Sequence, residues 1–299
     1  MQPSATLTPE LLAGLGSLKL QAECLLIGTL AGMHASPFQG FSAEFDQYRG
    51  YTPGDDPRSF DWRIFGRTGQ TMVKRFRDES NTSLYLILDS SASMGYTVSQ
   101  GLPKLRLAGI MAGALATLAY RQRDGIGLYS GSAGLEQSLA PRSGGAQYRE
   151  VLNRLQNLLP QGQSGFKAVL ASAAQRMKSG SMVFVFTDLW QNADDILAGL
   201  KQIRAKNQAV SLVHLATAQE KDLKDRGEIV YRDLESGETL RLTPETFRQT
   251  YGRAFAQHVA SVRVACRDVG IRFHGMDLDL PLELGFRELI RDFGAKAGS

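Results

Sequence analysis

The sequence predicts an α/β protein with a mostly parallel β-sheet, helices on both faces, and an added N-terminal helical and irregular segment. From Leu84 onward, short apolar runs alternate with stretches whose apolar residues follow helical spacing. That order is expected when helices connect parallel strands. The expected strands are residues 84–89, 125–130, 181–188, 209–216 and 270–279. The expected helices are residues 104–123, 148–158, 166–178, 194–206 and 244–268.

The N-terminal part of the chain has a different texture. Residues 8–34 are leucine-rich and open with Thr8 and Pro9, which suit a helix N-cap and first turn, so one or two helices are expected. Residues 36–80 are rich in Gly, Pro, Asp, Arg and aromatics and indicate turns and short strands. We therefore expect residues 1–79 to be an appended segment. Residues 80–299 form the main domain, with a hairpin insertion at residues 228–241.

Composition limits the class of protein. The 299 residues are 43% hydrophobic and 21% charged, which is typical of a globular chain. A net charge of +4 is too small for a dedicated nucleic-acid surface. Cys24 and Cys266 are far apart and form no zinc motif. The apolar stretch Leu107–Tyr120 is too short to span a bilayer, and no secretory signal opens the chain, so a cytoplasmic location without a membrane span is expected.

Two of the expected strands end in an acid. Asp89 closes the first strand and Asp188 closes a later one. In an open α/β sheet these ends face the same edge, where two carboxylates repel unless they are hydrogen-bonded, protonated or bridged by a cation. Ser91 and Ser93 add two hydroxyl oxygens, the hard ligands that Mg²⁺ accepts. The alternative is that these residues only cap the turn after the strand.

The D-x-S-x-S pattern at residues 89–93, with a later strand ending in F-T-D, resembles the metal-ion-dependent adhesion site of the von Willebrand factor type A domain. The resemblance implies a Rossmann-like sheet and a site for Mg²⁺, or for Mn²⁺ or Ca²⁺. It implies that Asp89, Ser91 and Ser93 hold the ion and that Asp188 assists through water. The family's threonine ligand corresponds to Ser164, which keeps the hydroxyl group.

The segment before the first strand narrows the resemblance. Its P-G-D-D-x-R-x-x-D-W element at residues 53–62, followed by V-K-R-F-R-D-E at residues 73–79, resembles the bacterial domain of unknown function 58 family over residues 40–214. Genes of that family commonly accompany AAA+ ATPases of the MoxR type. The resemblance implies an adaptor that works with such an ATPase, and with a client protein, in protein maturation or complex assembly. Many relatives carry transmembrane helices ahead of this region.

Residues 49–79 mix basic and acidic side chains with aromatics. One interpretation is that charge pairs and Trp62 pin an irregular segment to the main domain. The other is that Arg58, Asp61, Trp62 and Arg63 form a docking surface for a partner. Nucleic-acid binding is less favoured because the nearby acids cancel much of the positive field.

Enzyme classes find little support in the motifs. A haloacid-dehalogenase-like phosphatase needs a second Asp two residues after the first, where this chain has Ser91. The sequence has no G-x-S-x-G elbow and no P-loop. We therefore expect a non-enzymatic interaction module whose divalent cation binds an acidic partner group, with no catalytic residues. The alternative left open is a metal-dependent hydrolase of phosphate esters.

Overall fold

The computed structural model describes residues 9–33, 47–50, 62–75, 83–97, 101–163, 165–190, 193–223 and 225–297. Its helices are α1 (Pro9–Ala13), α2 (Leu18–Ala31), α3 (Trp62–Thr68), the 3-10 turn η2 (Ala92–Gly95), α4 (Lys104–Arg121), α5 (Gly145–Gln156), α6 (Phe166–Arg176), α7 (Ala193–Arg204), α8 (Ala218–Lys221), α9 (Pro244–Asp268) and α10 (Leu282–Ala297). Its strands are β1 (Gln47–Gly50), β2 (Met72–Arg75), β3 (Ser83–Asp89), β4 (Gly125–Gly131), β5 (Leu135–Arg142), β6 (Met182–Thr187), β7 (Ala209–Ala216), β8 (Ile229–Arg232), β9 (Thr239–Leu242) and β10 (Arg272–Asp277).

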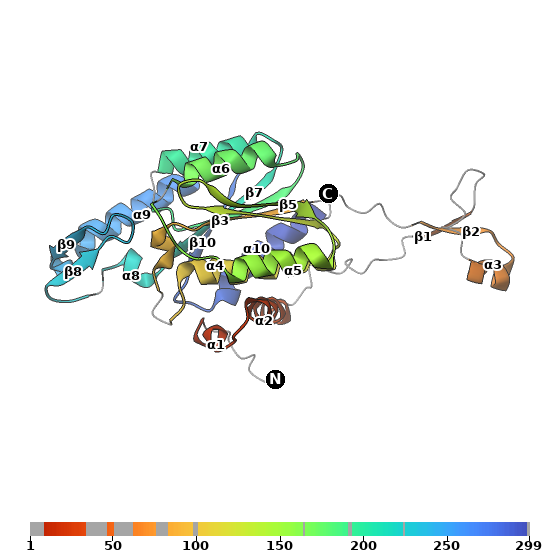
Figure 1. Ribbon diagram of the computed structural model, residues 1–299, viewed down its shortest axis with the longest axis horizontal. Helices are drawn as coiled ribbons and strands as arrows, with labels where there is room; N and C mark the ends of the chain where they lie inside the picture. The colour runs from red at the N-terminus through yellow and green to blue at the C-terminus, as the bar shows by residue number, and fades with distance from the viewer. Residues whose placement is uncertain are drawn as a thin grey trace.

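A six-stranded sheet forms the centre of the molecule (Figure 1). Its strand order is β10-β7-β6-β3-β4-β5, and every neighbouring pair is parallel except β4 with β5. The chain begins this sheet at β3 and later returns to β3's other side with β6. The strand order therefore reverses between β3 and β6, which is where open α/β sheets usually bind ligands.

Alternate side chains of the strands enter two separate cores. Leu84, Leu86 and Leu88 of β3 pack into a core shared with α2, α4, α5 and α10. Tyr85 and Ile87 face the opposite core, which is shared with α6, α7 and α9. This two-residue alternation follows from the pleat of a strand, and it explains why β3 is apolar on both faces. The result is a sheet covered by helices on both sides, as the sequence predicts (Figure 1).

Helix α2 adds an outer layer to one side of the molecule, below α4 in Figure 1. Its buried residues Leu18, Ala22 and Leu25 join the core beneath α4. Gly113 of α4 permits this close approach, because a Cβ at that position would lie 3.0 Å from a Leu18 methyl carbon and 3.1 Å from the Ala22 Cβ. The N-terminal helical part is thus packed on the main body, while the predicted domain boundary at residue 79 stays a prediction.

The expected strands and helices are present, with ends shifted by a few residues. The expected hairpin is present as the antiparallel pair β8–β9, and α9 has the bounds that the sequence predicts. Strand β5 and helices α3, α8 and α10 were not among the expected elements. Strand β5 is an edge strand whose residues alternate between half-buried and exposed, so it lacks the apolar run that reveals the central strands.

Candidate functional site

The candidate site lies where β3 and β6 end side by side. Leu88 of β3 pairs with Phe186 of β6, so Asp89 and Asp188 arrive at the same edge of the sheet. The charge of Asp188 contributes to a raised pKa of Asp89, as expected when two acids lie near each other where the strand order reverses. The structure therefore brings together the two acids that sequence reasoning paired.

Asp89 is fully buried and held from two sides. Its Oδ1 accepts a hydrogen bond from the Ser91 backbone N–H at 3.0 Å, and its Oδ2 accepts one from the Thr187 hydroxyl at 2.8 Å. The Ser91 and Ser93 hydroxyl oxygens lie 3.1 Å apart. Burial, and then the charge of Asp188, raise the pKa of Asp89 to about 7, although the hydrogen bonds oppose this rise.

Asp188 is held by a buried lysine. Lys104, only 1% exposed, places its Nζ 2.6 Å from Asp188 Oδ2 and 2.7 Å from Glu220 Oε1. Burial alone would lower the pKa of Lys104, but the two carboxylates outweigh it and the pKa is raised. Glu220 also accepts hydrogen bonds from the Thr217 backbone N–H and hydroxyl, at 2.9 and 3.0 Å, in the capping box that begins α8.

A third loop contacts the Asp89 loop. The Gln161 N–H donates to the Ser90 carbonyl at 2.8 Å, and the Ala92 N–H donates to the Gly162 carbonyl at 3.1 Å. Ser164 itself lies outside the described residues. The loop that carries it does reach the edge of the sheet where the acids lie, but the predicted role of Ser164 stays a prediction.

Two large apolar side chains are exposed in the loops at this edge. Trp190 is 51% exposed, and its backbone N–H donates to Asp188 Oδ1 at 3.3 Å. Leu159, in the loop after α5, is 71% exposed. Leu189 is held in the left-handed region at φ 57°, which an ordinary side chain adopts only at a cost. His258 Nε2 lies 3.2 Å from the Leu189 carbonyl oxygen and supports this turn from α9.

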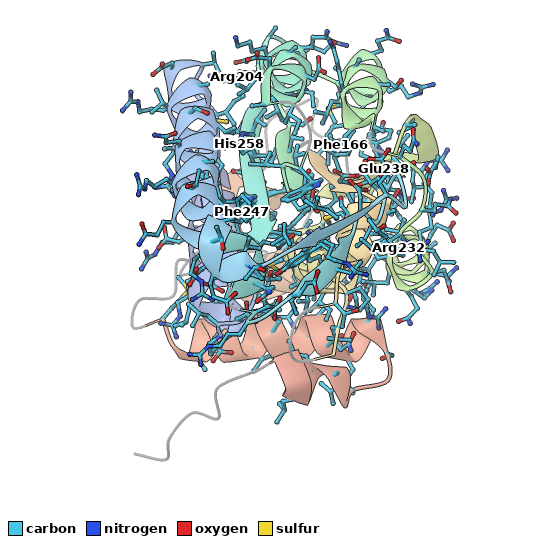
Figure 2. All side chains as sticks on the ribbon, turned by 90° about the vertical axis from the view of Figure 1, so that its left-hand side faces the viewer. Phe166, Arg204, Arg232, Glu238, Phe247 and His258 are labelled. Carbon is cyan, nitrogen blue, oxygen red and sulfur yellow. The ribbon has the colours of Figure 1, made fainter. Side chains whose placement is uncertain are left out.

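Figure 2 views the end of the molecule from which the hairpin projects. The hairpin, labelled at Arg232 and Glu238, crosses the view, and α9, labelled at Phe247 and His258, stands beside it. The chain enters this projection through α8, whose Glu220 is paired with Lys104. The Lys104–Glu220 and Lys221–Asp277 ion pairs thus connect α8, which leads to the hairpin, with the edge of the sheet.

The side chains fit a hard divalent cation by their chemistry. In the described part of the chain, no group of three or more His, Cys, Asp and Glu side chains could hold a metal ion, so an ion here would need hydroxyl ligands. Asp89, Ser91 and Ser93 supply a carboxylate and two adjacent hydroxyls, all oxygen donors. Asp188 and Glu220 also outnumber the single ammonium of Lys104, which leaves negative charge for a cation to neutralise.

The described residues do not test the predicted roles of the other site residues. Arg58 and Asp61 lie outside the described residues. Trp62 and Arg63 begin α3, which lies with β1 and β2 well away from the hairpin in Figure 1. The proposed docking role of these four residues stays a prediction.

Sequence reasoning missed Thr187, Lys104 and Glu220. Thr187 directly precedes Asp188, but nothing local indicates that its hydroxyl reaches Asp89. Lys104 carried a signal, because a lysine at the first position of a helix opposes the helix dipole. Glu220 lies far along the chain, and only the fold brings it to Lys104.

The sequence of this chain matches a known protein family. Residues 47–261 match the family model described as Protein of unknown function DUF58. The chain belongs to this family. Two relatives are the uncharacterized proteins Rv1480 of Mycobacterium tuberculosis and Mb1516 of Mycobacterium bovis, each 26% identical over 88% of this chain and 83% of the relative.

Two solved structures are similar to this chain, and the first of them supports the fold. BatB from Bacteroides thetaiotaomicron superposes with a TM-score of 0.50 and 16% identity, over 73% of this chain and all of that one (100%). The SpRpn10 VWA domain has a TM-score of 0.38 and 12% identity, over 70% of this chain and 93% of that one. This DUF58 protein therefore has an α/β fold with a mostly parallel sheet covered by helices on both faces, as the sequence predicts.

The expected cytoplasmic location is wrong. A similar structure comes from an aerotolerance-related membrane protein of Bacteroides fragilis, with a TM-score of 0.47 and 16% identity over 70% of this chain and 98% of that one. None of the helices in the described ranges combines the length and apolar character needed to cross a membrane, and that finding assigns no compartment.

Proposed function

We propose that this chain is a non-enzymatic interaction module that works with a MoxR-type AAA+ ATPase in protein maturation or complex assembly. Its Asp89, Ser91 and Ser93 side chains would hold a divalent cation, and that ion would bind an acidic group of the partner. The carrying observation is the cluster of buried oxygens where the strand order of the sheet reverses.

The surroundings of the cluster support a protein partner. Trp190 and Leu159 are large, apolar and exposed in loops at this edge, and aromatic anchors around a polar centre are common where proteins bind one another. The ATPase partner is supported by the resemblance to the DUF58 family, whose genes commonly accompany MoxR-type ATPases. When bound, the ion would supply a positive charge for the partner's carboxylate.

Capture of the organism's MoxR-type ATPase by the immobilised full chain tests the proposal. We expect capture with Mg²⁺, loss with a chelator, and a loss of about tenfold or more in affinity with Asp89→Asn. Asparagine is similar in shape, can accept the Ser91 N–H bond and can meet the Thr187 hydroxyl, so the fold should persist. Asp195→Asn is the matched control, because Asp195 is an exposed acid that pairs only with the exposed Lys167 among the ion pairs described.

Two results would count against the proposal. Capture that survives both Asp89→Asn and the chelator would remove the metal bridge. Mg²⁺-dependent hydrolysis of phosphate esters that Asp89→Asn abolishes would replace the interaction module with a hydrolase.

A further inference from the structure

Lys104 is an unusual residue for its position. It is the first residue of α4, directly after Pro103, where the partial positive charge of the helix N-terminus disfavours a lysine. It is also almost fully buried, although burying an ammonium is costly unless partners compensate. The surroundings of Lys104 must therefore compensate both the unfavourable helix dipole and the burial of its ammonium.

The compensation comes from a pair of carboxylates. Lys104 Nζ donates to Asp188 Oδ2 at 2.6 Å and to Glu220 Oε1 at 2.7 Å. The ring of Tyr96 lies 5.8 Å from the same ammonium, and the Tyr96 carbonyl accepts the Lys104 backbone N–H at 3.0 Å. The lysine is therefore held by its backbone and by its charge, directly behind the second acid of the candidate site.

Asp188 and Asp89 have different partners. Lys104 contacts Asp188 and Glu220, whereas Asp89 is held only by neutral donors, from Ser91 and Thr187, in its described hydrogen bonds. A divalent ion that bound both Asp89 and Asp188 directly would be neutralised by the protein alone. An ion with Asp89 as its one anionic protein ligand keeps a positive charge for an outside carboxylate.

We propose that Lys104 is a positioning residue that holds Asp188 away from the divalent ion, so that the ion binds the protein more weakly and retains charge for the partner's acid. This inference rests on the metal bridge proposed above. It adds a specific role for a residue outside the D-x-S-x-S motif.

Calorimetric titration of the purified full chain with Mn²⁺ alone measures the metal affinity and tests this role. Lys104→Gln frees Asp188 to approach the ion, and we expect the Mn²⁺ affinity to rise about tenfold or more. Lys104→Arg keeps the positive charge and should stay near the wild-type affinity. The double variant Lys104→Met with Asp188→Asn removes both charges of the pair, and it should also stay near wild type.

Thermal unfolding gives a second readout. Without metal, Lys104→Gln leaves the buried Asp188 without its ammonium partner and should unfold about 10 °C below wild type, whereas Mn²⁺ should restore much of that loss. A Lys104→Gln protein that folds only with Mn²⁺ present would support the inference. One that fails to fold even with Mn²⁺ would overturn it.

The affinities separate this inference from the proposed function. Equal Mn²⁺ affinity in wild type and Lys104→Gln overturns the role of Lys104 while leaving the metal bridge intact. A gain in the double variant equal to that in Lys104→Gln also overturns it, because the effect would then not depend on Asp188. If wild type binds no Mn²⁺ but Lys104→Gln does, Lys104 still restrains Asp188, but the metal bridge of the native protein fails, and so does the charge kept for a partner's acid.

Discussion

Asp292 on α10 is a half-buried acid that joins the helix to the outer strands of the sheet. Its Oδ2 lies 2.7 Å from His274 Nε2 on β10 and accepts from the Ser211 hydroxyl on β7 at 2.9 Å. Burial by itself raises the pKa of Asp292, but the contacts from His274 and Ser211 and the charge of Arg272 outweigh burial, so the pKa lies below its ordinary value. The ionised carboxylate therefore stabilises the folded protein.

Replacing Asp292 with asparagine should make that contribution visible. Because the folded-state pKa is depressed, the stabilisation is present above the ordinary carboxyl pKa of about 4 and is lost as the pH falls through the lower folded value. We expect Asp292→Asn to lower the free energy of unfolding by about 1–2 kcal/mol at pH 7, with the difference shrinking below about pH 4. Urea unfolding of wild type and Asp292→Asn at pH 7 and below about pH 4 measures this difference.

The exposed pair of Glu288 with Arg291 on the same helix provides the control for Asp292. Glu288→Gln should change stability by less than about 0.5 kcal/mol at either pH. A loss from Asp292→Asn that stays constant down to the acid limit would mean that packing, and not the charge of Asp292, explains its effect.

Helix α4 ends in a way that its sequence does not favour. After the last helical residue, Arg121, the chain turns at Arg123 with φ 61°, the left-handed conformation that glycine adopts most easily. Arg123 is exposed, so no buried contact compensates for this cost. The buried stretch before it, Leu107–Ala119, is instead stabilised by packing against the sheet and α2.

Arg123→Gly should therefore stabilise the protein. We expect a gain of about 0.5–1 kcal/mol in the free energy of unfolding, because glycine removes the steric cost of the left-handed turn. Arg121→Gly is the matched control: it makes the same change two residues earlier, within the helix, and should cost about 0.5–1 kcal/mol. Chemical denaturation of both variants measures the opposite signs, and equal losses would contradict this account of the helix end.

The body of the molecule continues into its N-terminal helices. Leu25 is fully buried in the core that α2 shares with α4 and α10, whereas Ile27, two residues later, is 59% exposed. Contacts across this layer join residues far apart in sequence. We therefore expect α2 and the sheet to unfold as one cooperative unit.

Truncating Leu25 tests whether α2 and the sheet unfold as one cooperative unit. Leu25→Ala should cost about 2–4 kcal/mol and should speed hydrogen exchange at the amides of β3, because the whole core loses that stability. Ile27→Ala, an exposed position on the same helix, should cost less than about 1 kcal/mol. If Leu25→Ala speeds exchange only in α2 and leaves β3 unchanged, the helix is a separate unit.

Much of this architecture is readable from periodicity. The strands β3, β6 and β7 are short apolar runs because both of their faces are buried, and the helices between them show one apolar face. Strand β5 was missed because a half-exposed edge strand with Pro141 near its end carries no such run. The hairpin β8–β9 was found because Ser236 and Gly237 interrupt two short β-rich segments.

The sequence was sufficient to predict the parallel sheet and the pair of acids at its edge, because both follow from local patterns: apolar runs, helical spacing, and the residues that end two strands. The strand order, the hydrogen bond from Thr187 to Asp89 and the pairing of Lys104 with Asp188 and Glu220 depended on the folded chain. Lys104 and Glu220 are 116 residues apart, and no local propensity encodes their contact. Packing brings these charges together, and burial strengthens the interactions between them because the protein interior screens charges less than water does.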